Sequence, residues 1–253
     1  MAAAAPSATP AQSNTDRSPA TAGIAQMASA VISRRNWARS LRAPLWWFLA
    51  AMVAGDLSVF DCAGVADGAA AAIVVRAEDA HRYTDRPLYV KALSSVAGNG
   101  SGLTDPAYDY TTFPEVARCA ADAYAQAGVT DPRAELAMAE VHDCFTPTEL
   151  VLMEDLGFCA RGTAWKEVLD GTFDLDGDLP VNPDGGLKSF GHPVGASGLR
   201  MMFEAWLQLR GEAPEARRVR TVPERTLALT HNLGGYPGEM VSFVAILGSQ
   251  PSA

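Results

Sequence analysis

Cysteine is scarce in this sequence of 253 residues, and its four copies, Cys62, Cys119, Cys144 and Cys159, show no paired spacing. Closely paired cysteines are the usual sign of a zinc site, so their absence argues against a bound metal. A chain of this length also has no need of disulfide bonds to hold a small core together. The sequence therefore predicts reduced thiols in a cytoplasmic protein.

Runs of basic residues are missing from the second half of the chain, and the formal net charge is −9. Because nucleic-acid backbones are bound by clustered cations, we expect no nucleic-acid partner. Long apolar runs are missing too. The run at residues 43–55 follows a basic patch but is too short to cross a bilayer, so we expect no membrane anchor.

Periodic apolar residues are almost absent from the first forty positions, which are rich in Ala, Ser, Thr and Pro. Such a segment buries too little surface to offset its chain entropy, which predicts disorder. From residue 52 onward the pattern is that of a packed domain. The whole chain is 48% hydrophobic and 19% charged, which is enough apolar mass for one substantial core or two small ones.

Apolar runs and helix start and stop signals indicate strands and helices that alternate along this domain. We expect strands at residues 69–75, 88–97, 134–141, 226–230 and 239–247. We expect helices to begin at Thr112, Thr146 and Pro193 and to end near Gly128, Gly157 and Gly211. This alternation predicts an α/β layered fold.

Several of these expectations concern individual side chains. Thr112 and Thr146 are expected to cap their helices through the side-chain oxygen. The small residues at positions 69–75 are typical of a strand packed tightly under another layer. The last helix carries an apolar stripe at three- and four-residue spacing, formed by Leu199, Met202, Phe203, Trp206 and Leu209.

Reactive side chains lie at three points where predicted elements change. His142 and Cys144 follow a predicted strand, His192 precedes a predicted helix, and His231 opens a loop with three glycines. Sites in open α/β sheets form at such junctions, so we expect one assembled site.

Each of these residues also has a purely structural interpretation. A helix start would keep His192 neutral beside a developing oxyanion and would favour the thiolate of Cys144. Helix ends attract polar residues in any protein, however, and unpaired cysteines are often small buried hydrophobes. The glycines after His231 either offer N–H donors or only close a hairpin. The pattern alone leaves both interpretations open.

Three segments together carry a family resemblance. They are His-Asp-Cys-Phe at residues 142–145, a glycine-rich run with Gly-His-Pro at residues 182–198, and His-Asn-Leu-Gly-Gly at residues 231–235. They resemble the thiolase superfamily, in particular the sterol-carrier-type thiolases often called acetyl-CoA acetyltransferases. The resemblance runs from residue 52 to the C-terminus.

The resemblance implies a thiolase-like layered α/β fold, with the C-terminal βαβαβαββ half and the last strands of the N-terminal half. In these terms, residues 1–50 are disordered or unrelated, residues 51–80 are a remnant of the N-terminal domain, and residues 81–253 form the C-terminal domain.

The resemblance also implies catalytic roles. His192 matches the histidine that activates the nucleophilic cysteine of thiolases and helps to bind the thioester oxyanion. His142 stands where other thiolases contribute an asparagine to that oxyanion hole. Cys144 matches the acid/base that acts on the substrate α-carbon. The substrate is then a coenzyme A thioester, and no further cofactor is implied.

The late glycine loop is implied to complete the site. Gly235 would supply the backbone N–H of a second oxyanion hole, and His231 and Asn232 belong to the same motif. Leu233 occupies the position at which other thiolases carry a cysteine.

One departure from the family stands against these matches. The nucleophilic cysteine of thiolases lies upstream of the matching segment, and no cysteine precedes Cys62, which is not the nucleophile. We therefore expect a truncated chain that is inactive alone, since acyl transfer would lose its covalent intermediate. An isolated half would also expose apolar surface, which predicts aggregation or pairing with another chain, and a dimer if the protein is complete.

Two other functions stay open on the sequence. The first is a thiolase-like retro-aldolase that acts on a steroid side-chain CoA ester, a group that lacks the nucleophile and relies on tyrosines such as Tyr236. The second is a non-catalytic subunit that docks on a complete thiolase or on an OB-fold partner protein.

Overall fold

A computed structural model describes residues 2–7, 52–54, 57–220, 222–236 and 238–251. Their main feature is a six-stranded mixed sheet with the strand order β4-β1-β5-β8-β7-β6. The strands are β1 (Ala2–Ser7), β4 (Ala71–Val75), β5 (Leu88–Ala97), β6 (Leu136–Glu140), β7 (Leu227–Gly234) and β8 (Val241–Gly248). Only β6 and β7 pair in parallel; the other neighbours are antiparallel.

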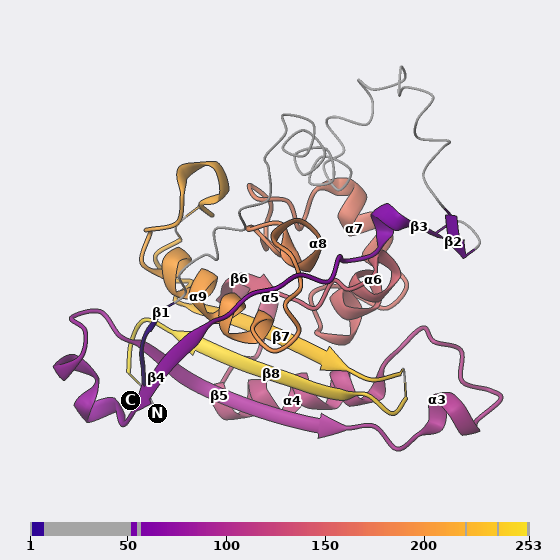
Figure 1. The fold of residues 1–253 in the computed structure, drawn as a ribbon, viewed down its shortest axis with the longest axis horizontal. Helices are drawn as coiled ribbons and strands as arrows, with labels where there is room; N and C mark the ends of the chain where they lie inside the picture. The colour runs from indigo at the N-terminus through magenta and orange to yellow at the C-terminus, as the bar shows by residue number, and fades with distance from the viewer. Residues whose placement is uncertain (1, 8–51, 55–56, 221, 237, 252–253) are drawn as a thin grey trace.

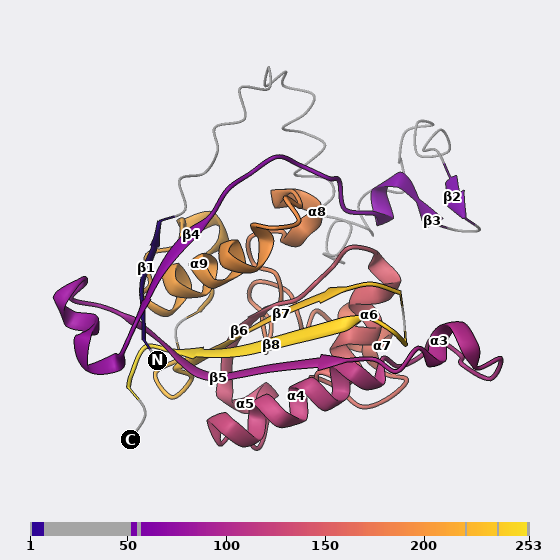
Figure 2. The same ribbon diagram turned by 60° about the horizontal axis from the view of Figure 1, so that its bottom comes forward.

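Helices lie on both faces of this sheet, as Figure 2 shows for α4 and α9. They are α3 (Ser101–Thr104), α4 (Pro114–Ala127), α5 (Pro132–Glu135), α6 (Thr146–Asp155), α7 (Ala164–Asp170), α8 (Gly186–Phe190) and α9 (Ser197–Leu209). Short 3-10 turns are η2 (Val59–Asp61), η3 (Ala77–Arg82) and η4 (Glu215–Arg217), and β2 (Met52–Ala54) pairs with β3 (Leu57–Ser58). The expectation of a layered α/β fold is confirmed.

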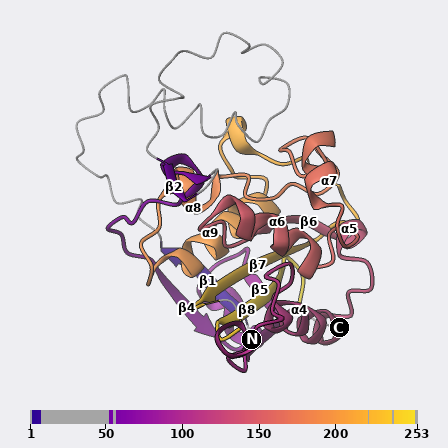
Figure 3. The ribbon, with the colours of Figure 1, turned by 90° about the vertical axis from the view of Figure 1, so that its right-hand side faces the viewer.

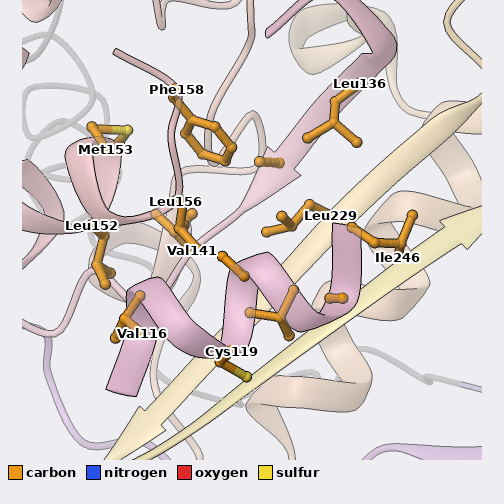
Figure 4. Close-up of a cluster of buried hydrophobic side chains, with 14 of the residues drawn as sticks. Val116, Cys119, Leu136, Val141, Leu152, Met153, Leu156, Phe158, Leu229 and Ile246 are labelled. Carbon is orange, nitrogen blue, oxygen red and sulfur yellow. The ribbon is translucent and has the colours of Figure 1, made fainter. Parts of the chain in front are cut away.

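The two faces of the sheet have separate apolar cores. On one face, α4 and α6 pack against the sheet through side chains that include Val116, Leu152, Leu229 and Ile246 (Figure 4). On the other face, a smaller cluster joins Ala205 of α9 to the sheet. The end-on view in Figure 3 shows α9 and α4 on opposite sides of the strands.

Strand β7 serves both faces, because alternate side chains of a strand point to opposite sides. Leu229 packs in the core on the α4 side. Thr230 and Asn232, on the other side, line a cleft next to α9.

The edge strands differ from expectation. Residues 69–75 were expected under another layer, but Ile73 and Val74 of β4 are 57% and 52% exposed. The strand lies at the edge of the sheet, and none of the described residues covers that surface. Residues 2–7, expected to be disordered, form β1, which lies between β4 and β5 and pairs with both through its backbone. The remainder of the predicted disordered segment lies outside the described residues.

The helix starts were predicted in the right places but with the wrong caps. Thr112 donates its hydroxyl to Asp155 of α6 at 2.8 Å instead of capping α4. Thr146 is the first residue of α6, and its hydroxyl donates to Asp61 at 3.2 Å. In both cases a tertiary partner replaces the local backbone partner of a capping side chain. Gly128 ends α4 in the left-handed conformation, as expected.

Three further boundaries moved. Residues 132–135 form α5 instead of the start of a strand, since Asp131 caps that turn by accepting from Ala134 at 3.1 Å. Helix α9 begins at Ser197, after a turn in which Pro193 accepts from Ala196. Strand β7 extends to Gly234, because its pairing with β8 continues through Asn232 and Leu233.

The buried face of α9 is not the apolar face that the sequence predicts. The apolar stripe is only partly buried, whereas Arg200, Glu204 and Gln208 are almost fully buried. These polar groups are paired: Arg200 with Glu140 at 3.2 Å and with Asp184, and Glu204 with Arg217 at 2.9 Å. Burial of charge is tolerated when each group has such a partner.

Candidate active site

The turn between β6 and α6 presents His142 and Cys144. Asn182 fixes its start, because the side-chain oxygen of Asn182 accepts from the amide of Val141 at 2.8 Å and its nitrogen donates to Glu149 at 2.9 Å. Asn182 itself has a positive φ of 50°. These two hydrogen bonds fix the end of β6. His142 and Cys144 follow it and line the cleft next to α9.

His192 lies between α8 and α9 and is held by the first residue of α9. Its Nδ1 is 2.8 Å from the hydroxyl of Ser197, and that hydroxyl donates to the carbonyl of Pro193 at 3.2 Å. Because a serine hydroxyl has one proton to donate, Nδ1 is the donor toward Ser197 and Nε2 keeps its lone pair. The geometry therefore presents Nε2 of His192 as a proton acceptor.

The two histidine rings meet edge to face. The centroids of His142 and His192 are 5.1 Å apart, with an angle of 85° between the ring planes. Both rings and the Cys144 side chain line one cleft of about 600 Å³ between α9 and the sheet. The remaining lining is mostly apolar and comes from Leu93, Val194, Gly195, Gly198, Leu199, Met202, Thr230, Asn232, Leu233, Gly234, Gly235, Val241, Phe243 and Ala245. A cleft of this size accommodates an organic ligand.

The histidines of the cleft are neutral near pH 7. Burial, helped by the nearby His192, lowers the pKa of His142 to about 4, although a contact with the Asn232 side chain opposes the shift. Burial also lowers the pKa of His192, and the charge of Asp143 acts in the opposite direction. Nδ1 of His142 is buried and has no hydrogen-bond partner in the described protein. A neutral imidazole that lines the cleft has one N–H, which can donate to a substrate oxygen.

Cys144 behaves differently from the expectation of a thiolate favoured by a helix start. Burial raises the pKa of the Cys144 thiol, and the hydrogen bond with Thr148 opposes this only in part. The negative charge of the adjacent Asp143 adds to the increase. Desolvation therefore outweighs the helix dipole, and Cys144 is a neutral thiol that can donate a proton.

His231 is not part of the cleft. It lies within β7 instead of in a loop, is fully buried, and its Nε2 is 3.2 Å from the hydroxyl of Ser242. Burial lowers its pKa to about 3. The error came from ending the strand at Thr230. His231 continues the strand two residues after the core residue Leu229, so its side chain points to the same side as that of Leu229.

Two residues of the glycine loop after β7 differ in their position relative to the cleft. Gly235 lines the cleft with a φ of 111°, and a Cβ there would lie 3.0 Å from Cα of Met240, so a glycine is required. Tyr236 does not line the cleft and is 69% exposed.

Two residues that the sequence analysis missed join distant segments at the site. Asp143 accepts a hydrogen bond from Leu187 at the start of α8, at 2.7 Å. Lys188 donates to the carbonyls of Val59 at 3.0 Å and Cys62 at 2.6 Å. Asp143 and the glycine-rich run are far apart in the sequence, so no local signal pointed to this contact or to Lys188.

The segment around Cys62 lies against both halves of the site. The amide of Ala63 donates to the carbonyl of Cys144 at 2.8 Å, and the amide of His192 donates to the carbonyl of Gly64 at 3.2 Å. One backbone segment therefore spans the two loops that carry Cys144 and His192.

Within the part of the chain that the structure describes, no group of three His, Cys, Asp or Glu side chains is arranged to hold a metal ion. Nor does the same part contain a helix of the length and apolarity needed to cross a bilayer.

Comparisons with known proteins agree with the motifs. Residues 103–249 match a family described as "Thiolase C-terminal domain-like". An acetyl-CoA acetyltransferase of Methanothermobacter thermautotrophicus is 41% identical over 187 residues, which is 74% of this chain and 47% of that protein. Sterol carrier protein 2 of Bos taurus is 34% identical over 70% of this chain and 32% of its own length.

Two further proteins are similar to this chain, one in sequence and one in fold. The benzoylsuccinyl-CoA thiolase subunit BbsB of Thauera aromatica is 31% identical over 81% of this chain and 54% of that subunit. A solved structure described as an Ltp2-ChsH2(DUF35) aldolase has a TM-score of 0.67 over 90% of this chain and 59% of that chain, at 24% identity, which shows a shared fold.

The chain thus spans about half the length of several curated relatives that it matches, with 47% of the archaeal acetyltransferase covered. The matched family covers more than half of the chain, from residue 103 to residue 249. By these matches and by its fold, the chain belongs to the thiolase family and contains the C-terminal domain of that family.

Proposed function

We propose that this chain carries the acid–base half of a thiolase-type acyltransferase site that acts on acyl-CoA or 3-oxoacyl-CoA thioesters. The observation that supports this most directly is the meeting of His142, Cys144 and His192 in one cleft. A base, a proton donor and a hydrogen-bond donor within one apolar pocket are what carbon–carbon bond formation next to a thioester requires.

Each residue has a role that follows from its protonation state. Nε2 of His192 accepts the proton of an attacking thiol. The ring of His142, which lines the cleft, donates an N–H to the thioester oxygen as negative charge develops there. The neutral thiol of Cys144 gives a proton to the substrate α-carbon in thiolysis and, as a thiolate, removes it in condensation. Gly235 adds a backbone N–H near the same pocket.

The covalent nucleophile is the part of the reaction that we do not assign to this chain. Cys119 is fully buried, and burial raises the pKa of Cys159, which lies outside the lining of the cleft. We propose that the chain alone does not complete acyl transfer. In this proposal the nucleophile belongs to a region of the family that the chain does not match, and the complete protein is a dimer or has a partner chain, for which an OB-fold protein is one candidate.

The acid–base half can be tested without the nucleophile. The purified chain is mixed with propionyl-CoA in deuterated buffer, and loss of the α-proton signal is followed by proton NMR. We expect exchange that disappears in Cys144→Ala and persists in the control Cys159→Ala. Absence of exchange in the unaltered chain, or exchange that is indifferent to Cys144→Ala, would reject the proposed role.

The same samples answer the question of complete turnover. Thiolysis of acetoacetyl-CoA by added CoA is followed by the loss of enolate absorbance, and we expect none above the uncatalysed rate. Turnover by this chain alone would show that one of its own cysteines forms the acyl intermediate.

The retro-aldolase alternative has less support from the geometry. The tyrosine on which it depends, Tyr236, is exposed and stands outside the cleft lining. Cleavage of a 3-hydroxyacyl-CoA that is lost in Tyr236→Phe and retained in Cys144→Ala would favour the aldolase over the acyltransferase.

A further inference from the structure

We infer that Asp143 is a positioning residue that holds the His142–Cys144 turn against α8 and sets the charge that His192 and Cys144 face. The inference rests on the proposed acid–base function, because it concerns the two groups that carry protons in that proposal. Asp143 does not line the cleft, so its effect is exerted through its neighbours.

The first support is a backbone clamp. One carboxylate oxygen of Asp143 accepts from the amide of Leu187 at 2.7 Å, and the other lies 3.4 Å from the amide of Lys188. Leu187 is fully buried, so the amide end of this bond is fixed by packing. The bond joins the turn that carries Cys144 to the short helix that leads into His192.

The shape of the chain around the carboxylate gives the second support. Gly186 has a φ of 63°, and a Cβ on it would lie 2.3 Å from Oδ2 of Asp143. No side chain fits there without displacing the carboxylate. The glycine therefore leaves a space that the Asp143 carboxylate fills.

The third support is the set of charges that face Asp143. Glu140 of β6 and Glu149 of α6 are buried carboxyls that interact with it, and Arg200 of α9 is the cation nearby. Arg200 is already paired with Glu140 and Asp184. Burial raises the pKa of Asp143, and the amides of Leu187 and Lys188 together with the charge of Arg200 oppose this by favouring the carboxylate.

On the cleft side, the negative charge of Asp143 raises the pKa of both His192 and Cys144. It favours a proton on His192 and disfavours loss of the proton from Cys144. The ring of His192, in turn, disfavours a positive charge on the neighbouring ring of His142. A single carboxylate therefore makes His192 a better acceptor and keeps Cys144 a donor.

The test uses the full chain and the small number of histidines, which are His81, His142, His192 and His231. Ring C–H signals are followed by NMR as a function of pH in the unaltered chain and in Asp143→Asn, with His192→Gln used for assignment. Asp155→Asn is the matched control, since Asp155 is also buried and accepts from a backbone amide, Phe113 at 2.7 Å, but does not act on His192.

We expect the titration of His192 to move to lower pH in Asp143→Asn and to stay in place in Asp155→Asn. The pH at which Cys144 is alkylated should also fall in Asp143→Asn. Unchanged titration of His192, or the same movement in both variants, would overturn the inference.

A second measurement covers the case in which Asp143→Asn does not fold. In the unaltered chain, the ring signal of His192 should show a second inflection at the pH where the carboxyl carbon of Asp143 titrates, and its absence counts against the inference. These readouts need no substrate. Failure of α-proton exchange with normal NMR coupling would reject the proposed function and leave the positioning role intact.

Discussion

The two faces of the central sheet differ in how their side chains are packed. Toward α4, the sheet is closed by an apolar cluster in which Val116, Leu229 and Ile246 are fully buried. Toward α9, the cluster is smaller, and Leu93 and Phe243 are 59% and 46% exposed at the open cleft. The first face supplies stability in a form that any close-packed core would give. The second face keeps reactive groups accessible and holds them with charged side chains.

The largest expected effect concerns the buried charges of the α9 face. Arg200→Met leaves Asp184 without its cation and Glu140 without its buried partner, and removal of one partner from a buried ion pair costs about 3–5 kcal/mol of unfolding free energy. The matched control is Arg118→Met, which breaks an exposed pair with Asp122 at 2.9 Å and should cost about 0.5 kcal/mol or less. Urea denaturation measures both, and equal losses would show that α9 is not held by charge.

A slightly smaller effect is expected from the apolar side of the comparison. Leu229→Ala removes a fully buried side chain on the α4 face and should cost about 2–5 kcal/mol. Phe243→Ala, on the cleft face, removes a side chain that is already half exposed and should cost about 1 kcal/mol or less. If Phe243→Ala destabilises the chain as strongly as Leu229→Ala, the cleft face is a closed core in solution.

The pH dependence of stability reports on buried carboxyl groups at both faces. Burial raises the pKa of Glu140 and Glu149 from an ordinary 4.5 to about 8. A group with a raised pKa binds more protons in the folded state, so the free energy of unfolding falls as the pH rises from 4.5 to 8. Buried His142 acts in the opposite sense only below pH 6.5, because its pKa is lowered to about 4.

Between pH 6.5 and 8 the two carboxyl groups therefore dominate, and Glu140→Gln should reduce the fall in stability. Glu135→Gln is the control, since backbone hydrogen bonds lower the pKa of Glu135 and its effect belongs below pH 4.5. Melting temperatures at intervals across this range test the difference. A slope that Glu140→Gln leaves untouched would mean that Glu140 is ionised in the folded chain.

The smallest expected effect is on the rate at which Cys144, in the cleft, is alkylated. Because burial raises the pKa of Cys144, alkylation of this thiol by iodoacetamide at pH 7 should be slower than in the urea-unfolded chain. Mass spectrometry of tryptic peptides gives the rate for each cysteine. Faster alkylation in the folded chain would identify Cys144 as an activated thiolate and would remove its proposed role as proton donor.

Much of this arrangement could be predicted from the sequence. The strand at Leu88–Ala97 and the end of α4 at Gly128 were expected, because alternation and a left-handed glycine are local signals. The meeting of His142, Cys144 and His192 was expected from motifs at element junctions, and the structure brings these residues together. The catalytic roles, the division into domains and the cytoplasmic location stay predictions.

Several of the errors share a physical origin, since the deciding partner lies in another element. Thr112 bonds to Asp155 instead of its own helix, and Arg200 finds Glu140 and Asp184 in other segments, which makes the polar side of α9 the buried one. His231 was misplaced because the pairing of β7 with β8 decides where that strand ends. Neither hydrophobic periodicity nor capping rules contain such long-range pairings.

Because side chains alternate along β7, substitutions at neighbouring positions affect different properties of the protein, either folding or the cleft. A substitution at His231 disturbs its hydrogen bond with Ser242 and hence folding, whereas one at Asn232 alters the wall that a ligand would touch. A single-residue insertion before this pair would exchange their surroundings and place an imidazole in the cleft and an amide in the core. Length variation in this strand is therefore far less tolerable than substitution at either position.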